Sequence, residues 1–303
     1  MLVLELGCKG LIDHLAFSPN GRALVATAND EVVLWSALKT GHRVEWVSGG
    51  KFALRPRFSA NGRWIFGGLS TLLRFDPKAG TSVAFEPWAD SGVEFDVSPT
   101  KPLLLVTRFE VGKRDLTELA LWRATDLSPA GKVWQRAFDE SPYRNVPQFL
   151  PGGKRFARVE ARWPAKGSFE CHVAVYDTAT GEPVGKPVRV AHRGVLSPDG
   201  RWVAECDGTA VNLCPVDPAK KAGSIRSSNR KHFTGVAFHP SGKYLAATSN
   251  DTTVRLYAVD TGHEVQAFTW DIGRMRSIAF SPDGTLAAAG SDKGKVIVWD
   301  VDV

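Results

Sequence analysis

The sequence predicts an all-β fold, a single seven-bladed β-propeller domain over residues 1–303, with four antiparallel strands in each blade. Three observations support this prediction. A short turn phrase recurs along the chain, a strand that ends on an aromatic residue follows most copies, and the copies are spaced by about 40 to 50 residues. A four-stranded unit that repeats at this period is typical of propeller blades.

The turn phrase consists of an apolar residue, a small polar residue, proline, a polar residue and glycine. Its clear copies are FSPNG from Phe17, FSANG from Phe58, LSPDG from Leu196, FHPSG from Phe238 and FSPDG from Phe280. Two weaker copies are VSPTK from Val97 and FLPGG from Phe149. Proline and glycine at these places favour a type I reversal, so each copy should join two antiparallel strands.

Each phrase is followed by an apolar strand and then by a second strand. The second strand ends on an aromatic residue in six copies, at Trp35, Phe75, Trp122, Tyr176, Tyr257 and Trp299, whereas the fifth copy has Cys214 there. We expect these aromatic residues, with Trp64, Trp202 and Tyr244, to pack between blades. A further turn should follow at Gly41, Gly80, Gly131, Gly181, Gly223 and Gly262. With the strand before the phrase, each unit holds four strands.

The two ends of the sequence complement each other. The last unit stops at Val303, soon after the strand that ends at Trp299, and so lacks a fourth strand, while residues 2–6 form an unassigned β-like segment before the first unit. Pairing this segment with the last blade would close the ring and cover an exposed sheet edge.

The repeats resemble those of the WD-repeat family. The phrase is followed by a turn that contains aspartate, at Asp30, Asp207, Asp251 and Asp292, then by the aromatic residue, with a Trp299-Asp300 pair in the last copy. The Gly-His pair of the family is absent before each phrase, and Gly7-Cys8 stands at its place in the first copy. The resemblance covers the whole chain and implies a propeller that binds macromolecules.

Composition and charge suggest a protein of the cytoplasm. The chain has no apolar run near eighteen residues and no basic, apolar secretory signal at its start, so we expect no membrane span. Its four cysteines show no metal-binding spacing and are expected to be reduced. The net charge of +6 suits an acidic partner but is also common among soluble proteins.

Four charged residues fall on the strands that lead into the second and third phrases. Arg57 should lie beside Asp96, and Arg55 beside Glu94, on neighbouring strands. We interpret the two pairs as an ion-paired seam between blades, with a ligand site as the alternative.

No sequence pattern indicates catalysis. The chain shows no nucleophile elbow, phosphate-binding loop or zinc spacing, so we expect no enzyme activity, no cofactor and no metal. The favoured function is a scaffold that binds a protein or peptide, as a monomer or within a larger complex. The alternatives are a propeller enzyme with an active site at the channel mouth and a nucleic-acid-binding propeller. The basic stretch of Lys220, Lys221, Arg226, Arg230 and Lys231 motivates the nucleic-acid alternative, although it lacks interleaved aromatic residues.

Two expanded repeats suggest where a partner binds. In WD-repeat propellers, the loops that enter the first strand and those between the second and third strands share a face. Insertions at residues 108–118 and 161–170 lengthen that face in the third and fourth units. Aromatic residues outside strands occur at Trp88, Tyr143, Trp163 and Trp270. The predicted binding residues are Trp88, Phe109, Lys113, Arg114, Tyr143, Arg144, Arg162, Trp163 and Phe169. The alternative is that the insertions fold back onto their own blades.

Overall fold

The computed structural model describes residues 2–5, 10–28, 31–38, 42–47, 55–68, 71–86, 92–109, 116–137, 147–162, 170–190, 194–216, 221 and 223–303. The chain divides into two compact units. The first consists of Met1–Pro56, Gly194–Pro215 and Ala219–Val303, and the second of Arg57–Arg193 and Val216–Pro218. None of the described residues belongs to a helix long and apolar enough to cross a membrane.

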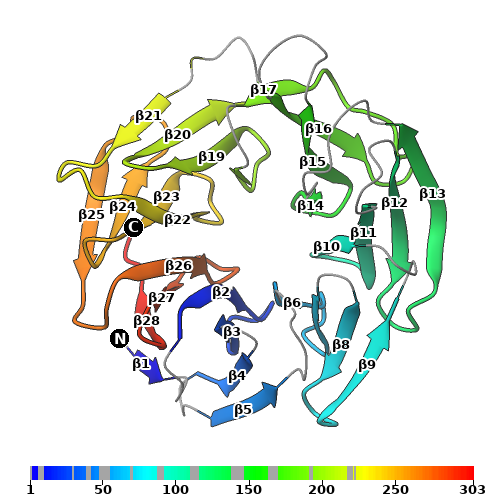
Figure 1. The fold of residues 1–303 in the computed structure, drawn as a ribbon, viewed down its shortest axis with the longest axis horizontal. Helices are drawn as coiled ribbons and strands as arrows, with labels where there is room; N and C mark the ends of the chain where they lie inside the picture. The colour runs from blue at the N-terminus through cyan, green and yellow to red at the C-terminus, as the bar shows by residue number, and fades with distance from the viewer. Residues whose placement is uncertain are drawn as a thin grey trace. The chain divides into compact units, whose positions relative to one another are not determined.

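Seven four-stranded antiparallel sheets make up the fold (Figure 1). We number them as blades 1 to 7 in the order of the turn phrases. The first unit holds blade 1 (β2 Ile12–Phe17, β3 Leu24–Ala28, β4 Glu31–Ala37, β5 His42–Val47), blade 5 (β18 Val195–Leu196, β19 Trp202–Asp207, β20 Ala210–Pro215, β21 Gly223–Arg226), blade 6 (β22 Phe233–Phe238, β23 Tyr244–Ser249, β24 Thr253–Ala258, β25 Glu264–Thr269) and blade 7 (β26 Met275–Phe280, β27 Leu286–Ser291, β28 Lys295–Asp300, with β1 Leu2–Glu5). The second unit holds blade 2 (β6 Arg57–Phe58, β7 Ile65–Gly68, β8 Leu72–Asp76, β9 Thr81–Phe85), blade 3 (β10 Gly92–Val97, β11 Leu103–Phe109, β12 Leu116–Arg123, β13 Pro129–Ala137) and blade 4 (β14 Pro147–Phe149, β15 Arg155–Arg162, β16 Glu170–Asp177, β17 Val188–Val190). The predicted seven-bladed β-propeller is confirmed.

The N-terminal strand belongs to the last blade. β1 pairs antiparallel with β28, in a register that runs from Leu2 opposite Val298 to Glu5 opposite Lys295. Blade 7 therefore has the strand order β1, β28, β27, β26. The prediction that the first strand completes the last sheet is confirmed.

The aromatic residue of the third strand occupies one register position in six of the blades. It lies opposite the seventh residue after the start of the phrase, as in Leu24 opposite Trp35 and Ala287 opposite Trp299. The other pairs are Ile65 with Phe75, Leu104 with Trp122, Phe156 with Tyr176, and Leu245 with Tyr257, while blade 5 pairs Val203 with Cys214. Five of the six aromatic side chains are buried, and Trp122 is half-buried. Their predicted packing role is confirmed.

Serine and an Asx residue stabilise the phrase turns of four blades. In blade 7, the Ser281 hydroxyl donates to Asp283 Oδ1 at 2.5 Å and accepts from the Leu286 amide at 2.9 Å. The same arrangement recurs at Ser18 with Asn20, Ser59 with Asn61, and Ser197 with Asp199. These bonds satisfy backbone groups of the reversal, as Asx and serine turns commonly do. The phrase is therefore a hairpin cap.

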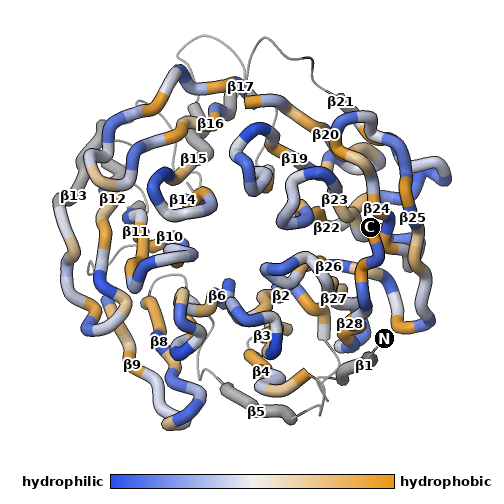
Figure 2. The backbone as a smooth tube through the Cα atoms, turned by 180° about the vertical axis from the view of Figure 1, so that it is seen from behind, coloured by the Kyte–Doolittle hydropathy of each residue, from blue (hydrophilic) through white to orange (hydrophobic). Residues whose placement is uncertain are grey.

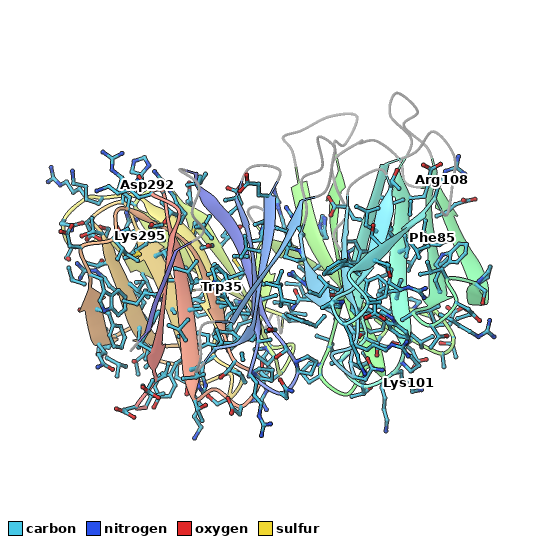
Figure 3. All side chains as sticks on the ribbon, turned by 90° about the horizontal axis from the view of Figure 1, so that it is seen from below. Trp35, Phe85, Lys101, Arg108, Asp292 and Lys295 are labelled. Carbon is cyan, nitrogen blue, oxygen red and sulfur yellow. The ribbon has the colours of Figure 1, made fainter. Side chains whose placement is uncertain are left out.

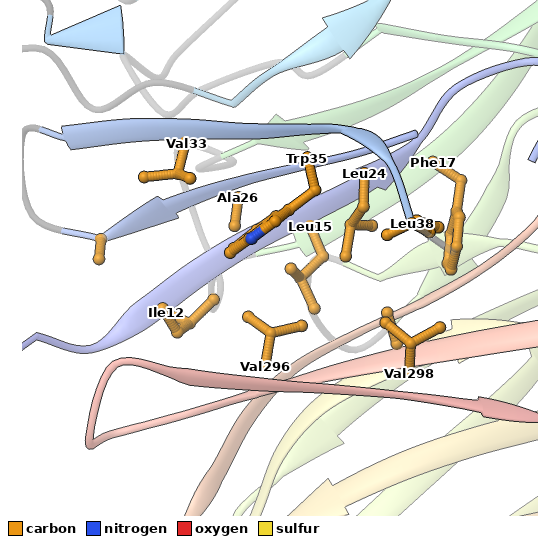
Figure 4. Close-up of a cluster of buried hydrophobic side chains, with 12 residues drawn as sticks. Ile12, Leu15, Phe17, Leu24, Ala26, Val33, Trp35, Leu38, Val296 and Val298 are labelled. Atoms are coloured by element: carbon orange, nitrogen blue, oxygen red, sulfur yellow. The ribbon is translucent and has the colours of Figure 1, made fainter. Parts of the chain in front are cut away.

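Apolar side chains fill the space between neighbouring sheets of the same unit. Figure 4 shows one such cluster, in which Trp35 of blade 1 packs with Ile12 and faces Val296 and Val298 of blade 7. Comparable clusters join blades 5 and 6, and 6 and 7, within the first unit, and blades 2 and 3, and 3 and 4, within the second. In Figure 2 the turns between the strands are largely hydrophilic. Burial of the strand faces is the main stabilising contribution to this fold.

Blades 3 and 4 differ from the sequence prediction at their second turn. Residues 108–109 and 116–118, expected in a loop, are paired strand residues, with Arg108 opposite Glu118. An ion pair of 3.2 Å joins these two side chains. Residues 161–162 likewise continue β15, with Arg162 opposite Glu170. The insertions thus lengthen the hairpins before any loop begins.

Two predicted turn glycines are also strand residues, because Gly131 lies in β13 and Gly223 in β21. Gly80, Gly181 and Gly262 do lie in turns and adopt φ of 67°, 72° and 69°, where glycine is favoured. The third turn of blade 3 instead has Leu127 at a φ of 59°. The left-handed conformation at this turn therefore occurs at the same place in the repeat whether or not the residue is glycine.

Cys206 and Cys214 form no disulfide bond, and they lie opposite Val211 and Val203 in the β19 and β20 pair. Burial, followed by the nearby Glu205 carboxylate, raises the pKa of Cys206 to about 12. The Cys206 thiol is therefore a poor nucleophile at neutral pH.

Candidate partner-binding site

The predicted binding residues fall largely outside the described residues. This holds for Trp88, Lys113, Arg114, Tyr143, Arg144, Trp163 and Phe169. The backbone of Phe109 ends β11 and that of Arg162 ends β15. Figure 3 shows Arg108, beside Phe109, at the end of blade 3 opposite to Lys101. The proposed clustering of these nine residues stays a prediction.

The predicted ion pair between Arg57 and Asp96 is present. Arg57 Nε lies 3.7 Å from Asp96 Oδ1, and the amide of Phe149 donates to Asp96 Oδ2 at 2.7 Å. Burial raises the pKa of Asp96, and the charge of Arg57 opposes that shift. One carboxylate thus connects the first strands of blades 2, 3 and 4, which supports the structural interpretation. Arg55 and Glu94 belong to different units, so their pairing stays a prediction.

The first unit contains a pocket of about 620 Å³ between blades 6 and 7, which we name the Trp270 pocket. Three segments form its walls: the turn between β23 and β24, the loop from β25 to β26, and the turn between β27 and β28. The lining residues are Thr252, Thr269, Trp270, Asp271, Gly273, Arg274, Asp292 and Lys293. These three segments lie at the same end of blades 6 and 7.

Aromatic packing holds one wall of the Trp270 pocket. The Trp270 ring stacks on Phe268 with centroids 5.6 Å apart and lies 4.7 Å from the ring of Trp299. Trp299 is the buried aromatic residue of blade 7. Trp270 lies in a loop, as predicted, and its side chain is half-buried against the blade core. Its ring is therefore positioned before any partner binds.

Asp292 fixes the opposite wall. Its Oδ1 accepts from the Arg274 amide at 3.0 Å, and its Oδ2 lies 3.8 Å from Arg276 Nη2. Gly273 has a φ of 109°, and a Cβ there would lie only 2.7 Å from Asp292 Oδ1. Asp292 lies at the end of the blade 7 strands in Figure 3. A larger residue at Gly273 would displace this loop.

Asp251 organises the neighbouring turn of blade 6. Its carboxylate accepts from Thr253 Oγ1 at 2.5 Å, from Asn229 Nδ2 at 2.5 Å and from Arg255 Nη2 at 3.2 Å. Partial burial raises the pKa of Asp251, but hydrogen bonds from Thr253, Asn229 and Ser249 outweigh burial and lower the pKa to about 2. Asn229 precedes the phrase at Phe238, about where the WD-repeat family has histidine. Here an amide replaces the imidazole.

A second, smaller pocket of about 360 Å³ lies in the other unit, near the turn between β12 and β13. Trp64 lines this pocket, with the guanidinium carbons of Arg63 and Arg74 at 4.9 Å and 5.2 Å from the centroid of its ring. Arg74 donates to the carbonyls of Ala124 and Thr125, and Arg63 pairs with Asp76 at 3.6 Å. Both arginines are therefore already held by intramolecular contacts.

The basic stretch is only partly described. Lys221, Arg226, Arg230 and Lys231 are exposed. Arg226 and the loop that holds Arg230 and Lys231 lie at the same end of blades 5 and 6 as the Trp270 pocket, because Arg226 pairs with Ala210 at the turn between β19 and β20. Across the described residues, no group of three or more metal-binding side chains occurs.

The fold and the repeated register define a β-propeller. The WD domain, G-beta repeat family matches residues 223–258 and 261–300, which contain the last strand of blade 5, the four strands of blade 6 and strands β26 to β28 of blade 7. The predicted resemblance is confirmed, because the family model places two WD repeats in the last part of the chain.

Curated relatives match parts of the chain. The WD repeat-containing protein SL1-17 of Schistosoma mansoni is 32% identical over 142 residues, 45% of this chain and 46% of that protein. A guanine nucleotide-binding protein subunit beta of Oryza sativa is 34% identical over 102 residues, 31% of this chain and 27% of its own length. The human serine-threonine kinase receptor-associated protein is 28% identical over 95 residues, which are 31% of this chain and 25% of that protein. The chain thus covers less than half the length of these relatives.

Sequence analysis did not identify the Trp270 pocket as a site, although one signal was present. The turns SNDTT and SDKGK align, so that Thr252 stands where blade 7 has Gly294. Comparing equivalent turns between repeats would have marked Thr252 as unusual.

Proposed function

We propose that the chain is a non-catalytic scaffold that binds a protein or peptide partner through the face formed by its strand-connecting loops. The observation that carries this proposal is the Trp270 pocket, which two blades build from turn and loop residues on that face. Concave sites with a few polar groups and a positioned aromatic wall suit ligand binding. The relatives include one protein named as a subunit and one named as receptor-associated, which also supports a role in assembly.

A second binding surface should lie in the other unit, at the predicted residues of blades 3 and 4. We propose that Trp88, Phe109, Lys113, Arg114, Tyr143, Arg144, Arg162, Trp163 and Phe169 contribute to partner binding. Aromatic and arginine side chains are enriched among residues that dominate interface energies. The protein would act in the cytoplasm, alone or as one component of a larger complex.

The test is affinity capture from native cell extract, followed by measurement of the binding constant with the purified captured partner. A Trp163→Ala, Arg114→Ala double variant should weaken binding by about 2 kcal/mol while leaving the melting temperature nearly unchanged. The matched control is Lys101→Ala with Lys154→Ala, which removes two exposed side chains from the opposite end of blades 3 and 4. Full binding by the folded double variant would exclude these loops, and failure to capture any partner would contradict the scaffold role.

A further inference from the structure

We infer that the Trp270 pocket docks an acidic segment of a partner protein, and that Thr252 keeps a strained backbone because its side chain belongs to this docking site. The inference rests on the proposed scaffold function and specifies the chemistry of the segment bound. It is carried by backbone strain at the pocket, by the rigidity of the pocket walls and by the charge around it.

Thr252 adopts a φ of 72°, in the left-handed region. Branching at Cβ makes this region unfavourable for threonine, and strained residues that persist are concentrated at functional sites. Gly294 takes the equivalent place in blade 7, directly before the third strand, at the same φ of 72° without that strain. Glycine would therefore satisfy the backbone geometry better in blade 6.

The Thr252 side chain makes no hydrogen bond to the described residues that would offset the backbone strain at this position. Within the described part of the chain, the Thr252 hydroxyl has no hydrogen-bond partner, whereas Thr253 next to it donates to Asp251. Thr252 lines the Trp270 pocket together with Thr269. Its hydroxyl is consequently free to bond a docked peptide.

The pocket walls need little rearrangement to accept a ligand. Trp270 is stacked on Phe268, and the Arg274 amide is bonded to Asp292. Arg276 is held by Asn250 Oδ1 at 2.8 Å as well as by Asp292. A site that is already ordered loses less conformational entropy when it binds.

The surface around the Trp270 pocket carries more exposed positive than negative side chains, which favours an acidic ligand. Among the described residues at this end of blades 5, 6 and 7, five exposed cations outnumber two exposed carboxylates. The cations are Arg226, Arg230, Lys231, Arg274 and Lys293, and the carboxylates are Asp207 and Asp271. The Asp251 and Asp292 carboxylates are already paired with arginine. A ligand that carries several negative charges is therefore attracted to this surface.

A peptide fits this surface better than a nucleic acid. Asp271 lines the pocket itself and would repel a continuous phosphate backbone, whereas a peptide can place its carboxylates only beside Arg274 and Lys293. Base stacking requires an accessible aromatic face. Trp270 is half-buried, with its ring already packed on Phe268 and close to Trp299.

Fluorescence anisotropy with the whole chain tests the inference. The probe is a labelled 12-residue peptide of glutamate interspersed with leucine and serine, compared with a peptide in which lysine replaces each glutamate and with a random 12-nucleotide single-stranded DNA. We expect the acidic peptide to bind at least tenfold more tightly than both comparison probes at low salt. Tighter binding of the oligonucleotide would overturn the inference in favour of a nucleic acid.

Two variants probe the site itself. Arg274→Glu with Lys293→Glu should weaken acidic-peptide binding at least tenfold, whereas Arg22→Glu with Lys243→Glu, which reverses two exposed cations at the phrase turns of the same unit, should leave it unchanged. Thr252→Gly should raise the melting temperature by about 1 to 2 °C, since strain is relieved, while weakening the peptide about threefold. Equal loss in the control, or unchanged affinity in Thr252→Gly, would contradict the site.

The outcomes separate this inference from the proposed function. If the acidic peptide does not bind but the native extract still yields a partner whose binding depends on Trp163 and Arg114, the inference is wrong and the scaffold role stands. If the extract yields no partner, the scaffold role fails as well.

Discussion

Blades 6 and 7 differ from blades 3 and 4 in how closely they follow the repeat, yet all four form the same kind of sheet. Blades 6 and 7 contain the segments that match the WD-repeat family, and their strands have six residues each, apart from the four-residue β1. Blades 3 and 4 carry the drifted phrases at Val97 and Phe149, and their second and third strands reach seven or eight residues. All four nevertheless place an aromatic residue at the same register position. Register and strand patterning therefore define the blade, and the signature residues refine its turns.

The largest effect should come from the shared aromatic position. Tyr176→Ala in blade 4 and Tyr257→Ala in blade 6 each remove a side chain that is at most 4% exposed, so each should cost about 3 to 5 kcal/mol of unfolding free energy. Urea unfolding of the two variants would measure both losses. A loss in blade 6 that is several times the loss in blade 4 would break the comparison, because it would mean that register matters only where the repeat is regular.

Removal of residues 1–6 should destabilise the regular region by about 2 to 4 kcal/mol. This deletion removes the four residue pairs between β1 and β28 and exposes the edge of blade 7, and each lost backbone hydrogen bond costs about 0.5 to 1.5 kcal/mol. Thermal melting of the deletion variant gives the result, with removal of Met1 alone as the control. An unchanged melting temperature would show that β1 does not contribute to stability.

The phrase turns should separate the two regions. Ser281→Ala in blade 7 removes bonds of 2.5 Å to Asp283 and 2.9 Å from Leu286, and should cost about 1 to 2 kcal/mol. Ser98→Ala in blade 3 removes only longer bonds, 3.2 Å from the Lys101 amide and 3.5 Å from the Thr100 amide, and should cost about half as much. Chemical denaturation resolves the two values. Equal costs would indicate that the drifted phrase is as strong a cap as the regular one.

The smallest effect concerns pH and the turn of blade 6. The pKa of Asp251 is lowered to about 2, below its ordinary value of 3.8, so its contribution to stability is present above about pH 4 and disappears as the pH falls toward 2. After allowance for solvent screening, the contribution is about 1 kcal/mol. Asp251→Asn should therefore be less stable than the parent at pH 7 and equally stable at pH 2. Unfolding free energies of the variant and the parent that differ by the same amount at every pH from 7 to 2 would show that the Asp251 carboxylate does not cause the pH dependence.

The sequence predicted the architecture because the architecture depends on periodic features. The phrase copies, the aromatic residues and the unassigned first strand were enough to predict seven blades and the pairing of β1 with the last blade. The pair of Arg57 with Asp96 also followed from alternation along neighbouring strands. Turn details were less accessible, because Gly131 and Gly223 look like turn residues but lie in strands whose length is set by pairing.

The site was harder to predict for a related reason. The greater length of the third and fourth repeats revealed the insertions of blades 3 and 4, whereas the Trp270 pocket is built from two short turns and one loop in repeats of ordinary length. The strain of Thr252 is invisible without a backbone angle, and the packing of Trp270 on Phe268 depends on the conformation of a loop. These features do not recur from one repeat to the next, so the pattern of the repeats does not predict them.

The pairing of β1 with β28 has a consequence for synthesis on the ribosome. The partner of Leu2 is Val298, so the first strand emerges long before the strand it needs exists. At about 5 to 20 residues per second, roughly 15 to 60 seconds separate the two events. Throughout that interval the nascent chain carries an unpaired strand, and the closing contact is among the most distant in sequence, which slows folding. Co-translational chaperones would therefore be expected to shield the first strand until β28 has been translated.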